Sequence, residues 1–288
     1  MSCNVTTVSK RKTRSRRRLV PLLLSHIVLI IISAGMLFPF FWMLGTSLKT
    51  LPEASQMPPI WWPSNPQWGN YKEMFSLAPL ARFYWNSVVV AVGVTVGSVF
   101  TSSLAAFAFA RLQFRGRDSL FLLYLATLMV PGQVTMIPAF IVVRYLGWID
   151  TYRGLILPGC FSAFGTFLLR QFFLTIPRDL EDAATVDGCS PFRVYWQVIM
   201  PLVRPALAAL AIFSFLGSWN NLLWPLVVTT KMEMRTIPVG LTFFQGQYVT
   251  MWHLLMAAAV VALVPLIVVY IIAQKYFVEG ITLGAIKG

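Results

Sequence analysis

Long apolar stretches, separated by short clusters of charged residues, dominate this chain. Residues 19–48, 83–110, 119–143 and 205–230 contain no Asp, Glu, Lys or Arg, and each exceeds the roughly 20 residues that cross a bilayer as a helix. Residues 236–274 are also free of charge, with a continuous apolar part at 254–273. Residues 154–169 reach spanning length only if the helix continues through Phe172 and Phe173, with the Arg170 charge extended to the interface. The pattern predicts an all-α polytopic membrane protein with six transmembrane helices.

Basic residues are distributed unevenly between the two sides that six spans create. The side that holds both termini receives 16 of the 23 Lys and Arg residues, and the other side receives 7. Cytoplasmic segments of membrane proteins carry the excess of basic residues. We therefore expect both termini in the cytoplasm.

A net charge of +13 is also typical of nucleic-acid binders. However, seven basic residues lie between Lys10 and Arg18, directly before the first predicted span. That position suits an anchor that contacts anionic lipid headgroups, and no aromatic residues alternate with the basic ones to stack on bases. Residues 1–18 are therefore interpreted as a basic cytoplasmic tail that contacts membrane lipid, and nucleic acid is not an expected partner.

Two regions are marked by prolines. In the outer segment 49–82, prolines prevent a long helix, while Trp61, Trp62 and Trp68 suit either an interfacial belt or contact with an external partner. In the third span, Pro131-Gly132 and Pro138 are expected to break the helix. Such a break fits either a packing kink or a transport route beside a water-filled cavity.

The segment between the fourth and fifth spans is acidic and is expected to contain two short cytoplasmic helices. Four of the chain's ten acidic residues fall in it, namely Asp179, Glu181, Asp182 and Asp187. Pro177 suits the first position of the first helix, and Gly188 is a natural stop. Ser190 is expected to cap the second helix. The first helix is shaped to enter a cleft on a soluble partner, and a simple connection between spans is the alternative.

In the second helix, apolar side chains recur at helical spacing. Phe192, Tyr195, Trp196 and Ile199 occupy positions i, i+3, i+4 and i+7. This periodicity predicts one apolar stripe that packs against the membrane-embedded core.

The acidic segment resembles the signature loop of bacterial ATP-binding-cassette (ABC) importer permeases. Asp182-Ala183-Ala184 is followed after three residues by Gly188, and after nine more by Val198-Ile199-Met200-Pro201. The family pattern is Glu-Ala-Ala, three residues, Gly, nine residues, Ile-x-Leu-Pro. The spacing is kept, while Asp182, Val198 and Met200 depart from the pattern. Because Glu181 precedes Asp182, either acid can fill the acidic position of the family.

Three other segments resemble the second, shorter permease of carbohydrate importers of the maltose-transporter type. They are residues 129–133, 218–225 and 276–281. The resemblance extends from the first span to the end of the chain. Residues 19–288 are therefore interpreted as one transmembrane domain, with a core at 83–275 and a coupling loop at 174–204.

This resemblance implies a non-catalytic permease subunit of an importer in a bacterial plasma (inner) membrane. The implied partners are a second permease, two ABC ATPases, an extracytoplasmic solute-binding protein, and a sugar or polyol cargo. The residues that it assigns to ATPase coupling are Leu180, Glu181, Asp182, Ala183, Ala184, Asp187 and Gly188. The chain lacks a Gly-x-x-x-x-Gly-Lys-Ser/Thr phosphate loop. ATP and Mg²⁺ are therefore expected on partner subunits, with no cofactor on this chain.

Two further sets of residues are candidate contacts. The cargo pathway is predicted at Gln133, Trp219, Asn220, Asn221 and Trp224, because aromatic faces and amides suit sugars, although membrane amides also join helices. The outer loop with Phe243, Phe244, Gln245 and Gln247 resembles one that reaches toward the binding protein.

The remaining alternatives receive less support from the sequence. The cysteines Cys3, Cys160 and Cys189 have no metal-ligand spacing, so free thiols and no metal site are expected.

An ion-coupled secondary transporter of a small polar solute is the alternative function. It would require ionisable residues inside the spans, and no acidic residue lies in a clearly predicted span.

Overall fold

The structure, a computed structural model, describes residues 13–246 and 248–285, which are helical apart from loops and an isolated β-bridge between Gln245 and Thr250. Within these ranges, three helices are long and apolar enough to cross a membrane. They are α1 (Thr13–Ser47), α4 (Leu80–Arg111) and α15 (Trp252–Ala285). Three bent helix pairs become further spans if each pair counts as one crossing. The described chain therefore contains three to six membrane-spanning segments.

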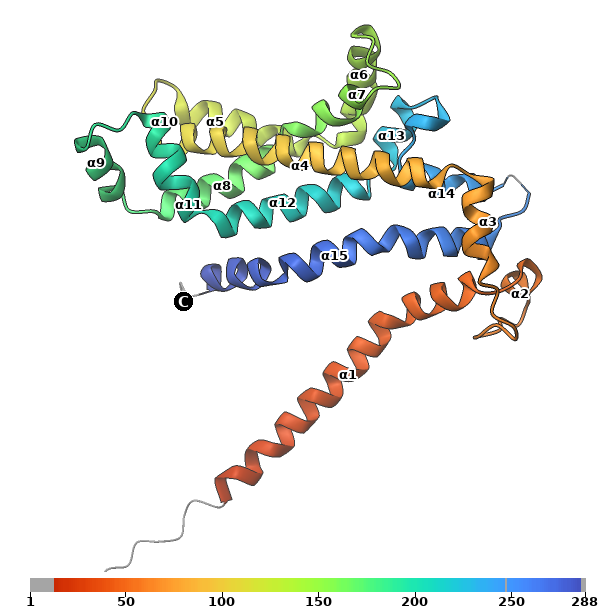
Figure 1. Ribbon diagram of the computed structural model, residues 1–288. Helices are drawn as coiled ribbons and strands as arrows, with labels where there is room; N and C mark the ends of the chain where they lie inside the picture. The colour runs from red at the N-terminus through yellow and green to blue at the C-terminus, as the bar shows by residue number, and fades with distance from the viewer. Residues whose placement is uncertain (1–12, 247, 286–288) are drawn as a thin grey trace, which may run out of the picture.

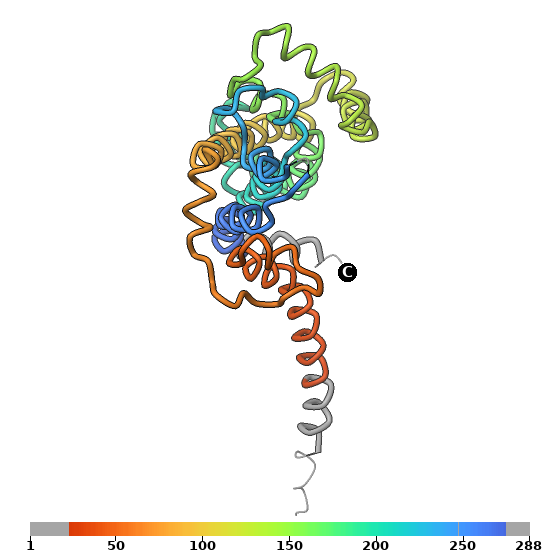
Figure 2. Tube along the Cα trace, turned by 90° about the vertical axis from the view of Figure 1, so that its right-hand side faces the viewer, coloured from red at the N-terminus to blue at the C-terminus, as the bar shows by residue number. Residues whose placement is uncertain are grey.

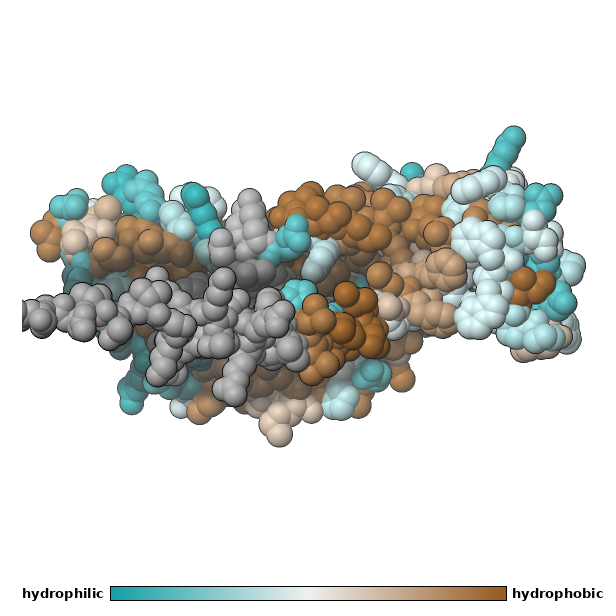
Figure 3. Space-filling view, turned by 90° about the horizontal axis from the view of Figure 1, so that it is seen from below, coloured by the Kyte–Doolittle hydropathy of each residue, from teal (hydrophilic) through white to brown (hydrophobic). Residues whose placement is uncertain are grey.

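Four helices run side by side through the body of the molecule (Figure 1): α4, α8 (Ala163–Thr175), α12 (Arg204–Trp219) and α15. Helix α4 packs against α8 and α12, and α12 packs against α15. Helix α1 contacts α15, and its residues 23–41 are exposed where the helix projects from the body of the molecule (Figure 2). Apolar side chains gather over the middle of the molecule, and one end is covered by more polar residues (Figure 3). This distribution suits a protein whose middle lies in lipid.

The third predicted span is sharply bent. It consists of α5 (Arg117–Ala126), a 3₁₀ turn η1 (Thr127–Met129) and α6 (Gly132–Tyr145), and its two arms meet at 101°. The break falls at Pro131, which has no N–H to continue the helix and disfavours helical backbone before it. The predicted helix break in this region is confirmed, whereas Pro138 lies inside α6.

The fourth predicted span is also a bent pair. Helix α7 (Tyr152–Ile156) with η2 (Leu157–Cys160) meets α8 at 41°. The Ser162 hydroxyl caps α8 by accepting the Gly165 N–H at 2.9 Å. The bend therefore falls at a capped helix start rather than within a continuous helix.

The predicted span over residues 205–230 is not one continuous helix. Helix α12 ends at Trp219, and α13 (Leu223–Val228) begins after a break at Asn220 and Asn221. The Asn221 side chain accepts the Trp224 N–H at 3.2 Å and thereby caps the new helix. Pro225 lies in the first turn of α13, where its missing N–H costs no hydrogen bond within the helix.

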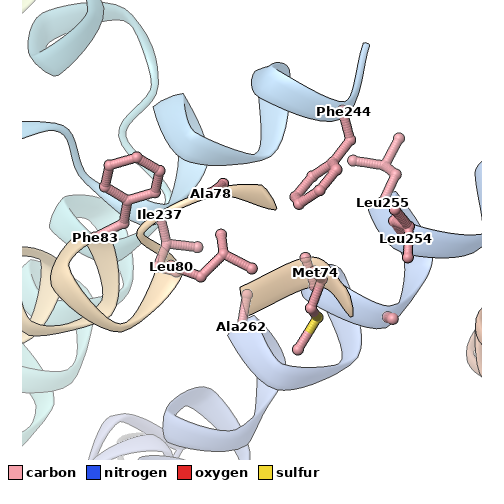
Figure 4. Packing of buried hydrophobic residues seen from close by; sticks show 11 residues of the cluster. Met74, Ala78, Leu80, Phe83, Ile237, Phe244, Leu254, Leu255 and Ala262 are labelled. Carbon is pink, nitrogen blue, oxygen red and sulfur yellow. The ribbon is translucent and has the colours of Figure 1, made fainter. Parts of the chain in front are cut away.

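Short helices close the end of the bundle opposite the acidic segment (Figure 1). They are α2 (Leu51–Ser55), α3 (Gly69–Leu77), η4 (Met232–Met234), α14 (Ile237–Leu241) and η5 (Thr242–Phe244). Met74, Phe83, Phe244 and Leu254 meet there in an apolar cluster (Figure 4). As the prolines predicted, residues 49–79 form no long helix, and α4 begins directly after Pro79.

Helix α4 contributes to each of three apolar clusters along its length. Phe83 belongs to the cluster beneath α3, and Val90 and Val94 pack with Val143, Leu155 and Val228. Farther along, Ala106, Phe107 and Ala110 pack with residues of α8, α12 and the acidic segment. Helix α4 therefore links both ends of the molecule.

Candidate transport site and coupling loop

The acidic segment folds as two helical arms joined at Gly188. The first arm is α9 (Asp179–Val186), which begins two residues after Pro177, so the prediction of Pro177 as its first residue is wrong. The Arg178 carbonyl instead starts the helix by accepting the N–H groups of Glu181 and Asp182 at 2.8 and 3.0 Å. Gly188 has φ of +83°, and nothing lies within 4 Å of an added Cβ. Glycine is favoured there by backbone conformation and not by lack of space.

The second arm contains a π-helix that changes which side chains face the core. It comprises α10 (Pro191–Arg193), the π-helix η3 (Val194–Ile199) and α11 (Met200–Leu202), and the Ser190 hydroxyl caps it as predicted. Tyr195 and Ile199 are buried together with Val194. The predicted four-residue stripe is wrong, because Phe192 and Trp196 are exposed. The wider π turn, with its i→i+5 hydrogen bonds, brings Val194 and Ile199 to the same face.

The predicted coupling residues divide into outward and inward groups. Leu180, Asp182, Ala183, Asp187 and Gly188 are exposed, whereas Glu181 and Ala184 are half-buried. Ala184 packs against the apolar cluster of α4, α8 and the second arm. The two adjacent acids, which the sequence leaves interchangeable, therefore have different surroundings.

Glu181 is engaged by a residue that sequence reasoning missed. Arg111 Nε lies 2.9 Å from Glu181 Oε1, and 3% and 16% of the two side chains are exposed. The pair is in ionic contact but is not aligned as a hydrogen bond at these two atoms. The pKa of Glu181 is raised by burial, although the charges of Arg111 and Arg178 oppose that shift. No local pattern could reveal this pair, because α4 and α9 are distant in sequence.

A cavity of about 640 Å³ lies where the broken helices meet. It is lined by three of the predicted pathway residues, Gln133, Asn221 and Trp224. The Trp224 indole N–H donates to the Gly154 carbonyl at 3.0 Å, which fixes α13 against α7. Sequence reasoning missed the hydroxyl-bearing lining residues Ser98, Thr135, Ser162, Ser214 and Ser218. Among the lining residues in the described part of the chain, none is charged.

The other two predicted pathway residues lie elsewhere. Trp219 is buried and donates its indole N–H to the Ala262 carbonyl of α15 at 3.2 Å, so it joins two helices and does not line the large cavity. Asn220 is exposed, and its amide donates to the Leu216 carbonyl of its own helix. Both residues border a separate, mostly apolar cavity of about 310 Å³ beside α1 and α15.

The loop after α14, predicted to lie on the outer side, also differs from the prediction. Phe243 and Gln245 are exposed, but Phe244 is fully buried in the cluster of Figure 4 and offers no surface to a partner. Gln247 lies outside the described residues. The neighbouring Tyr248 is 91% exposed, and Val249 is exposed beside it. These two exposed side chains were not anticipated by the sequence analysis.

Metal chemistry has no support in the part of the chain that the structure describes. No group of three or more His, Cys, Asp or Glu residues is placed there to hold an ion. Cys160 and Cys189 are free thiols, while Cys3 lies outside the described residues.

Comparison with known proteins identifies the class. Residues 97–283 match the family described as binding-protein-dependent transport system inner membrane component. The arabinooligosaccharides transport system permease protein AraQ of Bacillus subtilis (strain 168) is 36% identical over 260 residues, which cover 88% of this chain and 91% of AraQ. The sn-glycerol-3-phosphate transport system permease protein UgpE of Brucella abortus (strain 2308) is 36% identical over 274 residues, 92% of this chain and 97% of UgpE.

A solved structure agrees in fold. A bacterial ABC transporter involved in the import of the acidic polysaccharide alginate contains a chain with a TM-score of 0.79 and 24% identity, covering 93% of this chain and 100% of that one. The present chain belongs to the family of binding-protein-dependent transport system inner membrane components. It is therefore a membrane-embedded permease subunit of an ABC transport system.

Proposed function

We propose that this chain forms half of the translocation pathway of an ABC importer for a neutral sugar or polyol. The cavity at the broken helices carries this proposal, since hydroxyls and amides line it together with the aromatic residues Phe161, Phe213 and Trp224. Such side chains satisfy sugar hydroxyls and cover their C–H faces. An anionic cargo would call for a cationic partner in a low-dielectric site, and the described lining offers none.

The names of the relatives support a carbohydrate-like cargo without choosing among them. One relative is named for arabinooligosaccharides, another for sulfoquinovosyl glycerol and another for sn-glycerol-3-phosphate. Because the lining of the cavity is uncharged, it favours a neutral cargo such as an arabinooligosaccharide over a phosphorylated solute. A second permease would supply the opposite wall of the pathway.

The proposed topology has six spans, with both termini and the coupling loop on the cytoplasmic side. In support, α9 lies at the end of the bundle opposite α2 and α3 (Figure 1), and the basic residues are concentrated on the α9 side in the sequence. An extracytoplasmic binding protein would then meet the other end, where Phe243, Gln245 and Tyr248 are exposed. A structure titled as an alginate transporter in complex with a pentasaccharide-bound periplasmic protein provides a precedent for such a partner.

ATP and Mg²⁺ would be bound by two partner ATPases, with α9 as the element that docks on them. Asp182 is the proposed contact with the partner, because its carboxylate is exposed while that of Glu181 faces Arg111. Coupling then requires that the ATP-bound partner favour one arrangement of the permeases over the other. An ion-coupled carrier receives no support from the cavity, since no acidic residue is among its described lining.

The test is uptake by the complete transporter in cells that lack other routes for the solutes. Labelled arabino-oligosaccharide, maltose, glycerol and glycerol 3-phosphate are compared, and a neutral solute is expected to be taken up. Gln133→Leu, in the cavity, should lower uptake, whereas the matched change Asn220→Leu, outside it, should not. Preferred uptake of glycerol 3-phosphate, or equal effects of the two variants, would contradict the proposal.

A further inference from the structure

The ion pair between Arg111 and Glu181 joins three elements at one guanidinium. Besides contacting Glu181, Arg111 Nη2 donates to the backbone carbonyl of Ile176 at 2.7 Å and to that of Phe173. The end of α4, the end of α8 and the first turn of α9 are therefore held together. Because both side chains are largely buried, removing either one leaves the other without its nearest counter-ion.

The second arm of the coupling loop is fastened to the same helix. The hydroxyl oxygens of Ser103 and Tyr195 are 2.7 Å apart and buried. The Phe107 ring packs on the Tyr195 ring with centroids 5.3 Å apart. Both arms of the loop are thus attached to residues 103–111 of α4.

Helix α4 also forms part of the wall of the transport cavity. Val90, Val94 and Ser98 of this helix line it. From Ser98 to Arg111, α4 continues as one helix without proline, a length of about 20 Å at 1.5 Å per residue. A continuous helix over this distance can carry a displacement from the coupling loop to the cavity wall.

We propose that Arg111 and Glu181 are a positioning pair that locks α9 onto α4, so that movement of α9 displaces the cavity wall. This inference rests on the proposed function, in which α9 docks on an ATPase. The counter-ion of Glu181 is then intramolecular, and of these two adjacent acids Asp182 is the one that presents its carboxylate to the partner. The two acids have separate tasks, with Glu181 holding the helix and Asp182 contacting the ATPase.

A double-mutant cycle on the assembled transporter tests the pair. Arg111→Gln, Glu181→Gln and the double variant are compared for cargo molecules imported per ATP hydrolysed and for ATPase subunits retained on purification. Each single change should lower the import ratio at least about fivefold, the lower end of typical coupling effects, while the ATPase stays bound. The double variant should be no worse than Arg111→Gln, because the effects of groups that act as a pair do not add.

Two results would contradict the positioning role of this pair: loss of the ATPase from Glu181→Gln, or additive effects in the double variant. Either would instead indicate that Glu181 contacts the partner ATPase. If Arg111→Gln is not recovered from membranes, Glu181→Asp keeps the charge on a shorter side chain and should give an intermediate import ratio. A wild-type ratio in both Glu181→Asp and Glu181→Gln would equally overturn the proposal.

Asp182→Asn separates this inference from the docking role. It should weaken ATPase retention, and its effect should add to that of Arg111→Gln. If Asp182→Asn changes nothing while the Arg111 and Glu181 effects still fail to add, the positioning pair stands and the assigned docking contact is wrong.

Discussion

Tyr152 donates its phenolic hydrogen to the Asn86 Oδ1 atom across 2.7 Å, which connects the start of α7 to the start of α4. The Asn86 amide nitrogen donates in turn to the backbone carbonyls of Glu233 and Arg235 at 2.7 and 2.9 Å. Asn86 is fully buried, and each of its polar atoms has a partner. The Asn86 side chain thus holds two separate segments against α4: helix α7 and the loop that contains η4.

Replacing Asn86 with leucine should therefore destabilise the protein strongly. The change removes the donor that serves the Glu233 and Arg235 carbonyls and the acceptor of the Tyr152 hydroxyl, so the Glu233 carbonyl keeps only the Arg82 Nε contact at 3.4 Å. A buried polar group left unpaired costs about 1–3 kcal/mol. Thermal unfolding of the purified protein in detergent measures the loss. Tyr152→Phe removes only one of these hydrogen bonds and should cost about 1 kcal/mol. Equal losses for the two variants would show that the carbonyl contacts contribute little.

Gly188→Val should impair coupling, while Gly188→Asn should largely preserve it. The φ of +83° at this position costs a β-branched residue about 1 kcal/mol or more, whereas asparagine tolerates the left-handed region. Valine would therefore redirect α9 without disturbing the long helices. Cargo-stimulated ATP hydrolysis by the assembled complex is the measurement. Similar activity in both variants would mean that the angle between the two arms does not control coupling.

Gly97→Ala should destabilise the contact between α4 and η2. An added Cβ would lie 2.2 Å from the Cys160 sulfur and 3.0 Å from its Cβ, and overpacking of this kind costs about 1–3 kcal/mol. Cys160→Ala removes the sulfur, so the double variant should recover part of the stability lost in Gly97→Ala. Unfolding temperatures of the two single variants and the double variant give the comparison. If the double variant recovers no stability, the loss in Gly97→Ala does not come from contact with the Cys160 sulfur.

Asp150 should make the contact between its loop and the segment after α13 sensitive to acid. Burial tends to raise its pKa, but hydrogen bonds from the Thr230 hydroxyl and the Thr230 and Lys231 N–H groups outweigh it and hold the pKa below the usual value. A carboxyl with a lowered folded-state pKa stabilises the fold above its ordinary pKa of about 4 and loses that contribution as pH falls further.

The measurement is the unfolding temperature of wild type and Asp150→Asn between about pH 7 and pH 3, a range that brackets the ordinary aspartate pKa. Wild type should be more stable at neutral pH, and the difference should shrink below about pH 4. Asparagine also tolerates the positive φ of residue 150, which makes it the matched replacement. A difference that persists unchanged at low pH would contradict the role assigned to the charge.

The apolar pattern predicts where helices occur better than where they break. Charge-free length was enough for the long helices around residues 19–48, 83–110 and 254–273. The break at Asn221 depends on one side chain capping a following N–H, and asparagine inside a membrane helix is equally compatible with an interhelical contact. The 101° bend at Pro131 has a local cause, but its size is set by tertiary packing.

The candidate coupling loop was found from spacing, whereas its internal contacts were not. Gly188 and Ser190 act locally, so their roles can be read from neighbouring residues. The π-helix at Val194–Ile199 shifted the buried face from the one that α-helical periodicity predicts. Arg111 was missed because its contact with Glu181 depends on how α4 and α9 meet in space, and no local sequence pattern signals that pairing.

Because the helix breaks between α12 and α13, the adjacent residues Asn220 and Asn221 border different cavities. Asn221 borders the large cavity, and Asn220 borders the small apolar one beside α1 and α15. Single-cysteine variants at these two positions would carry the same spectroscopic label at nearly the same depth in the membrane. A signal change at residue 221 alone would report an event in the large cavity, whereas a change at both would report movement of the helices themselves. Two neighbouring positions thus provide a built-in reference for time-resolved measurements on the working transporter.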